Sequence, residues 1–229
     1  MHRHFEDEIA ELRTELLYMA SLVEKAVEFS INALTHRDAA LAQKVIDEDV
    51  QVNQLEVKID NLCVELIARF QPMASDLRFI AAAMRINNDL ERIGDHGVNI
   101  AQHTQELLKE PELKPLIDIP RMAKLAQGMV KLALDAFVHG AVQQAIQVCE
   151  GDDEVDALED QVLRELITYM ASDPRTISRA IHLIMIAKNL ERVADLSTNV
   201  AEEVVFMVEA RSIKHHLAKN DVHDRSMTQ

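Results

Sequence analysis

Apolar side chains recur at spacings of three and four residues along most of the chain, which is the period of an amphipathic α-helix. The clearest stripe runs through Phe79, Ala83, Ile86, Leu90, Ile93, Gly97 and Ala101. The pattern predicts helices near residues 6–35, 38–70, 76–108, 121–149, 152–171 and 175–216. We therefore expect an all-α protein.

Prolines mark the breaks between these helices, because proline lacks the backbone donor that a helix interior needs. Pro72 and Pro174 separate helices within each half, and three prolines fall between residues 110 and 120. This proline-rich segment predicts a semi-rigid linker. We therefore divide the chain into residues 1–110, residues 119–217 and a tail at 218–229 that we expect to be disordered.

The two halves repeat each other. LERIGDHGVNIA at residues 90–101 matches LERVADLSTNVA at residues 190–201, and six of the twelve positions are identical. A second block, residues 49–56, aligns with residues 152–159 at an offset of 103. Self-similarity of this kind indicates repeated structural units. We predict two tandem, pseudo-repeated three-helix bundles.

A polar line lies beside the apolar stripe of the repeated helix. Its members recur every fourth residue: Glu91, Asp95 and Asn99 in the first half, and Glu191, Asp195 and Asn199 in the second. Carboxylates at this spacing repel each other. Two explanations stay open: neighbouring arginines neutralise them (Arg85, Arg92, Arg192), or a bound cation does.

Two glycines, Gly94 and Gly97, fall inside the same predicted helix, where each costs about 1 kcal/mol relative to alanine. Their counterparts in the second half, Ala194 and Ser197, are also small. We therefore expect another helix or a ligand to approach this helix closely.

A cation site needs ligands from more than one helix, because one acidic pair fills only two coordination positions. The preceding helix of each half offers further oxygens: Asp49 and Asn53 in the first, Asp152 and Asp156 in the second. If adjacent helices pack antiparallel, the two polar lines can face each other. An oxygen-rich set favours magnesium, calcium, manganese or iron over zinc. A solvated acidic face is the alternative.

Composition narrows the function classes. With 24 Lys and Arg against 39 Asp and Glu, the net charge is −15, which argues against a nucleic-acid partner. No apolar run approaches the ~20 residues that cross a bilayer, and no secretory signal is present. We expect a cytoplasmic protein that reaches a membrane only through its partners. Its two cysteines, Cys63 and Cys149, are interpreted as core residues.

Signatures of catalysis are missing. The sequence has no Glu-x-x-His pair of the kind that di-iron carboxylate proteins use, no phosphate loop and no Gly-x-Ser-x-Gly. His96 has Leu196 as its counterpart, so we interpret it as an incidental polar residue. His36 and His139, again offset by 103, are expected near helix ends. Nothing in these patterns indicates an enzyme.

Three segments together resemble the PhoU family, the accessory proteins of bacterial phosphate-specific transport. They are QPMASDLR at 71–78, DLERIGDH at 89–96 and KNLERVAD at 188–195. The resemblance extends from Phe5 to about Glu209. It implies a cytoplasmic negative regulator of the phosphate regulon, a homodimer, whose partners are a phosphate-sensing histidine kinase and the ATP-binding subunit of the phosphate ABC transporter.

The resemblance also implies metal clusters held by pairs of the form Glu/Asp-x-x-x-Asp. The pairs Glu91 and Asp95, Glu191 and Asp195, and Asp152 and Asp156 match that form. Asn53 departs from it and leaves Asp49 without a carboxylate partner, although an amide oxygen can still coordinate a cation.

Three functional hypotheses follow. The first is a regulatory adaptor that binds iron, manganese or magnesium on its acidic faces and performs no chemistry. The second is a metal-dependent hydrolase or oxidase that uses the same carboxylates. The third is a structural helical repeat without a ligand, against which the repeated polar line argues.

Overall fold

The computed structural model describes residues 2–213, and within that range the chain forms helices and no strand, which confirms the all-α prediction. In order, the elements are α1 (His2–His36), α2 (Ala39–Phe70), α3 (Ser75–Leu107), α4 (Asp118–His139), α5 (Val142–Ser172), the short 3-10 helix η1 (Pro174–Thr176) and α6 (Ile177–Glu209). The predicted tail at 218–229 lies outside the described residues.

Local chemistry explains where the helices of the first half begin and end. Asp38 caps α2 by accepting the backbone N–H of Leu41 at 3.0 Å. Gln71 ends the same helix in the left-handed conformation, with φ at 48°, immediately before Pro72. These boundaries agree with the predicted helices to within a few residues.

The predicted position of the break between the first and second helices of the second half was wrong. We placed it between residues 149 and 152, but α4 ends at His139 and α5 runs from Val142 through Gly151 without interruption. Gly140 causes the break, because it adopts φ +62° and its N–H bonds the carbonyl of Ala136. The last helix also ends earlier than predicted, at Glu209, where Ala210 turns left-handed.

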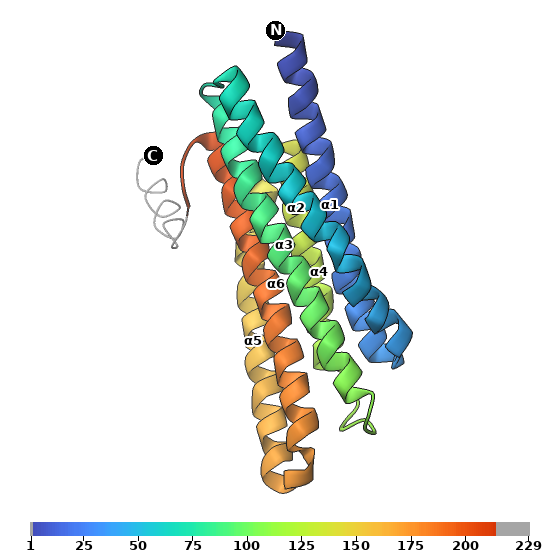
Figure 1. Cartoon of the computed structure of the whole chain (residues 1–229). Helices are drawn as coiled ribbons and strands as arrows, with labels where there is room; N and C mark the ends of the chain where they lie inside the picture. Colours follow the sequence, from blue (N-terminus) through green and yellow to red (C-terminus); the bar gives the residue numbers. More distant parts are fainter. Residues whose placement is uncertain (1, 214–229) are drawn as a thin grey trace, which may run out of the picture.

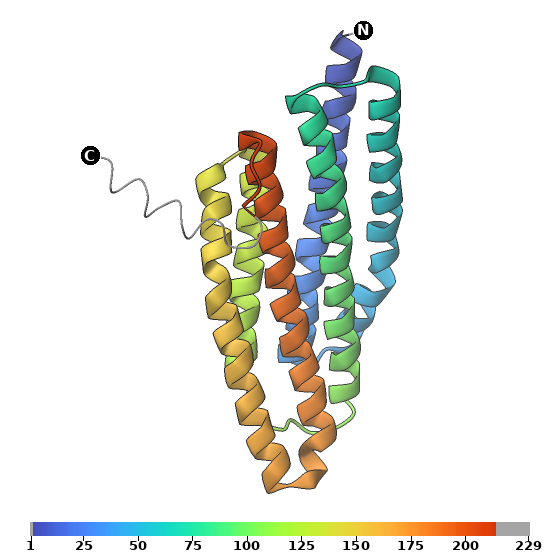
Figure 2. The same cartoon turned by 90° about the vertical axis from the view of Figure 1, so that its left-hand side faces the viewer.

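The six helices form two three-helix bundles that lie side by side (Figures 1 and 2). In the first bundle α1, α2 and α3 pack on one another, and in the second α4, α5 and α6 do the same. The repeated helices α3 and α6 are the inner pair and run antiparallel along their whole length, while α1 contacts α4 (Figure 2).

One hydrophobic core joins the two bundles. Buried side chains of α1, α2 and α3 are continuous with those of α4, α5 and α6. Phe79 of α3 and Phe137 of α4 stack across the boundary with ring centroids 5.9 Å apart. The division into domains at residues 1–110 and 119–217 stays a prediction, but the bundles share their interior.

The proline-rich linker packs against the bundles. Leu113 and Leu116 lie on the core, and the side chain of Lys114 is 5% exposed and pairs with Glu165 of α5. Arg179 of α6 donates to the carbonyl of Pro111 at 3.0 Å. The predicted semi-rigid connection is therefore a packed segment that ties the end of α3 to the second bundle.

Close approach of another helix explains Gly97. A Cβ atom on Gly97 would lie 3.3 Å from the backbone carbon of Ala26 in α1, so α1 and α3 nearly touch there. We expected a helix or a ligand to approach here, and the structure shows that α1 approaches Gly97. A Cβ atom on Gly94 would lie 3.4 Å from the side-chain Cγ1 of Val52 in α2.

Candidate metal-binding faces

The first candidate face lies between α2 and α3. Asp49 and Asn53 of α2 are joined by a hydrogen bond in which the Asn53 amide donates to the carboxylate at 2.8 Å. A Cβ on Gly94 would be 3.8 Å from Oδ1 of Asp49, so this carboxylate lies directly beside the helix that carries Glu91 and Asp95. The antiparallel packing of α2 on α3 thus brings the two polar lines together, as we expected.

The carboxylates of the first face lie close enough to affect one another's ionisation. Burial raises the pKa of Glu91, the negative charges of Asp95, Glu56 and Asp49 raise it further, and the charge of Arg92 opposes the rise. Burial also raises the pKa of Asp49, with Asp95 adding to the effect and the Asn53 hydrogen bond opposing it. Mutual repulsion of this kind is what a bound cation would relieve.

The second face is built in the same way from α5 and α6. Burial and then the neighbouring Asp195 raise the pKa of Glu191 to about 7, with smaller contributions from Asp156 and Glu159 and an opposing one from Arg192. Burial and Asp195 also raise the pKa of Asp156. Asp156 of α5 therefore faces the Glu191 and Asp195 pair of α6 as Asp49 faces the pair of α3.

Arginines neutralise the two faces unequally. Arg192 donates to Asp195 at 2.9 Å and lies 3.4 Å from Glu191, so it bridges the second acidic pair. Its counterpart Arg92 instead approaches Asp89 at 3.6 Å. The arginine explanation thus applies more strongly to the second face: on the first, the charge of Arg92 opposes the rise in the pKa of Glu91, but among residues 2–213 no arginine bridges Glu91 and Asp95.

Three further predicted ligands lie around these clusters. Asp152 of α5 lies near Cys149, whose thiol has its pKa raised to about 11 by burial first and then by the charges of Glu202 and Asp152. Asn199 lines a groove between α3 and α6 with Arg92, Arg192 and Asp195. Asn99 occupies a half-buried position one turn beyond Asp95.

The donor chemistry fits a hard cation, but the ligand shell is not closed. Among residues 2–213 no three His, Cys, Asp or Glu side chains are gathered closely enough to hold a metal ion. Each face nevertheless holds a half-buried glutamate, Glu91 or Glu191, whose pKa is raised by burial first and then by the neighbouring carboxylates. Oxygen donors at such a site suit magnesium, manganese or iron, with water completing the coordination.

Sequence reasoning missed the groove between α3 and α6. Arg92 and Arg192, equivalent residues of the two repeats, meet there beside Asp195 around a space of about 290 Å³. His96, which we interpreted as incidental, bonds Asn189 of α6 at 2.8 Å across the same interface. The offset of 100 makes Arg92 and Arg192 equivalent residues. Together with the assumption that α3 and α6 pack antiparallel, it could have predicted that these two arginines lie close together.

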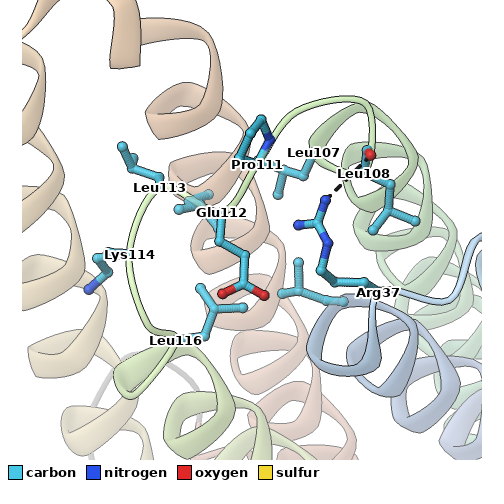
Figure 3. Close-up of a pocket in the computed structure, with 10 residues that line it drawn as sticks. Arg37, Leu107, Leu108, Pro111, Glu112, Leu113, Lys114 and Leu116 are labelled. Atoms are coloured by element: carbon cyan, nitrogen blue, oxygen red, sulfur yellow. Dashed lines mark hydrogen bonds between the residues drawn. The ribbon is translucent and has the colours of Figure 1, made fainter.

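A small pocket at the linker has no room for a substrate (Figure 3). Leu107, Leu113 and Leu183 line it together with Arg37 and Glu112, and Arg37 donates to the carbonyl of Leu108 at 3.4 Å. Its volume of about 20 Å³ fits about one water molecule.

Other sequence-based interpretations concern single residues. Cys63 is buried, which raises the pKa of its thiol to about 12, as expected of a core cysteine. His36 and His139 both lie at helix ends and bond the carbonyls of Asn32 and Asp135 at 3.0 and 2.9 Å. No helix among residues 2–213 is long and apolar enough to cross a membrane.

Comparison with known proteins identifies relatives over nearly the whole chain. The family model of the PhoU domain matches residues 16–104 and again residues 119–204. The Phosphate-specific transport system accessory protein PhoU homolog of Pseudomonas aeruginosa is 40% identical over 214 residues, which are 93% of this chain and 88% of that protein.

Solved structures agree with the sequence relatives. The crystal structure of PhoU from Pseudomonas aeruginosa superposes with a TM-score of 0.88 at 41% identity and covers 90% of this chain and all of that one. The phosphate transport system regulatory protein PhoU from Streptococcus pneumoniae gives a TM-score of 0.83 at 29% identity over 91% of this chain and 98% of that one.

Proposed function

Because the chain belongs to the PhoU family, we propose that it is an accessory protein of a phosphate-specific transport system and has no catalytic activity of its own. In this role it represses the phosphate regulon and limits phosphate uptake when phosphate is plentiful. It acts in the cytoplasm as an adaptor between a phosphate-sensing histidine kinase and the ATP-binding subunit of the phosphate ABC transporter.

The observation that carries this proposal is the match of both halves to the PhoU domain, at residues 16–104 and 119–204. The relative from Pseudomonas aeruginosa bears the accessory-protein name, and the one from Streptococcus pneumoniae is called a regulatory protein. Long helices with partly exposed polar faces suit binding to other proteins.

Deletion of the gene tests the regulatory role. We expect phosphate-starvation genes to be switched on in phosphate-rich medium when the protein is absent, and the wild-type gene supplied in trans to restore repression. A strain that keeps these genes silent without the protein would show that it is no negative regulator.

The two acidic faces support a metal-binding part of the proposal. Asp49 and Asn53 would hold a cation with Glu91 and Asp95 on the first face. The second face would use Asp156 with Glu191 and Asp195. The cation supplies positive charge that offsets the repulsion between these carboxylates, while the chain's own residues fix the spacing of the ligands on two helices. Asp152, Asn99 and Asn199 would be further ligands on these faces.

Self-association is the last part of the proposal. Val50, Val57 and Val64 recur every seventh residue on α2 and are 53–56% exposed. A heptad stripe of this kind packs well against a copy of itself. Analytical ultracentrifugation of the wild type and of a Val57→Glu variant tests this, since the charge should shift a dimer to monomer.

A further inference from the structure

Two histidines that are 79 residues apart in sequence meet at the interface of the two bundles. The Nδ1 atoms of His103 on α3 and His182 on α6 lie 3.1 Å apart, and the ring centroids are 5.3 Å apart. Both side chains are half-buried. Figure 2 shows α3 and α6 side by side, and the pair joins these two helices across the contact between the repeats.

The contact has a simple acid–base consequence. One ring must donate Nδ1–H and the other must accept it, because two protonated nitrogens cannot share this distance. Burial and the neighbouring His182 lower the pKa of His103. At neutral pH the pair therefore keeps at least one nitrogen lone pair directed at its partner, held by two rigid helices.

The spacing of the two nitrogens also suits a shared cation. Zinc–imidazole bonds are about 2.0–2.1 Å long, so nitrogens 3.1 Å apart would subtend about 100° at one metal ion. That angle is close to the tetrahedral value. A cation can thus replace the shared proton if each ring turns by about 40° to aim its Nδ1 lone pair at the common metal position.

Glu106 offers a further oxygen nearby. It lies one turn after His103 on α3, and the charges of His182 and His103 contribute to lowering its pKa after the larger effect of Lys109. In the structure Lys109 donates to both carboxylate oxygens at 2.7 Å. Water would complete a shell that begins with two imidazoles, because Lys109 occupies Glu106 and no third His, Cys, Asp or Glu side chain among residues 2–213 is gathered with the pair.

From this geometry we propose that His103 and His182 form a binding site for a borderline transition-metal cation such as Zn²⁺, which clamps α3 of the first bundle to α6 of the second. The site differs in chemistry from the acidic faces, because its ligands are nitrogens and those of the faces are oxygens. It does not depend on the proposed regulatory function.

Zinc affinity measured by competition with a chromophoric chelator tests the site. The background protein carries His→Gln changes at positions 2, 4, 215, 216 and 223, so that histidines near the chain ends do not compete. We expect His103→Gln and His182→Gln each to weaken zinc binding at least tenfold. His96→Gln is the matched control, since His96 is also half-buried on α3 and bonds α6, and it should bind zinc as the background does.

Copper spectroscopy supplies a readout that does not depend on the variants folding well. Electron paramagnetic resonance of the Cu²⁺-loaded background protein should show two coupled imidazole nitrogens. Equal zinc affinity in all variants, or copper with fewer than two coupled imidazoles, would overturn the site. So would loss of zinc binding in Glu91→Gln/Asp95→Asn alone, because zinc would then sit on the acidic face.

Discussion

Gly97 of α3 and Ala26 of α1 are in direct backbone contact: a Cβ on Gly97 would lie 3.3 Å from the carbonyl carbon of Ala26 and 3.4 Å from its Cβ. A helix backbone cannot shift as a flexible side chain can. A methyl group at this position would be crowded, and α1 would have to move away by a few tenths of an ångström, although a glycine inside a helix is unfavourable in itself.

Alanine substitutions at two glycines should therefore have different effects. Gly128 lies in the interior of α4 with nothing within 4 Å of a built Cβ, so Gly128→Ala should stabilise the protein by about 1 kcal/mol. In Gly97→Ala, crowding against Ala26 should offset this gain in the free energy of unfolding. Urea unfolding of both variants measures the difference, and equal stabilisation would show that α1 gives way at this point.

Metal should act on stability through the two acidic faces. Without metal, a variant with Glu91→Gln, Asp95→Asn, Glu191→Gln and Asp195→Asn should be as stable as the wild type or slightly more stable, since repulsion is removed. With Fe³⁺, Mn²⁺ or Mg²⁺ at a hundredfold excess over Kd, only the wild type should gain about 2.7 kcal/mol. Thermal unfolding with chelator and with each metal is the measurement.

The outcome separates the explanations of the acidic faces. Equal shifts in the two proteins, or no shift in either, would mean that the carboxylates are solvated or arginine-paired and that the metal site must be abandoned. A gain that survives only in Glu191→Gln/Asp195→Asn would locate the metal on the first face, which has no arginine bridge.

Glu191 should make stability fall as pH rises. Its pKa is raised from 4.5 to about 7 in the folded protein, so between these values the folded state binds more protons than the unfolded state. The free energy of unfolding of Glu191→Gln, compared with that of the wild type, should thus increase from pH 5 to pH 7. Unfolding measured across this range tests it in the presence of chelator.

Glu150→Gln on an exposed position of α5 provides the control for that experiment, because it makes the same substitution outside the acidic pair. A difference that stays constant with pH in Glu191→Gln as well would indicate that Glu191 ionises as an ordinary surface glutamate.

The linker should respond to loss of the charge opposite Lys114. Breaking a fully buried ion pair costs about 3–5 kcal/mol, and Glu165→Gln should cost less, about 2 kcal/mol, because the Glu165 side chain is 37% exposed. Adding Lys114→Met should recover most of the loss by removing the stranded charge. If the double variant is no more stable than Glu165→Gln, the packing of the linker does not depend on this pair.

Sequence alone predicted the parts of this fold that local chemistry determines. The stripe from Phe79 to Ala101 and the repeat at an offset of 100 were sufficient for the helices and for the pairing of two bundles. The break after His139 was missed because Gly151 and Asp152 look like a helix start. The offset of 103 between His36 and His139 indicated the correct position, and Gly140 provides the required left-handed turn.

Features that depend on the meeting of distant helices could not be predicted in the same way. That the polar lines of Asp49 and Glu91 face each other could be predicted, because α2 and α3 are consecutive helices joined by a short connection and such helices usually pack antiparallel. The contact between His103 and His182 instead requires the register of α3 on α6, and no local pattern specifies which residues of two long helices face each other.

That register makes the two halves complementary and not self-complementary. Arg85 faces the buried Glu203 at 2.9 Å, and His96 faces Asn189. Because the repeats align at an offset of 100, His103 corresponds to Glu203 and Asp89 to Asn189. If two first halves packed on each other in the same register, Arg85 would therefore meet His103, and His96 would meet Asp89. Two second halves would set Glu203 against Met185. If the chain were cut in the linker, the Arg85–Glu203 ion pair could consequently form only between unlike halves, so this one contact turns a duplicated helix into a pair that favours heterotypic association.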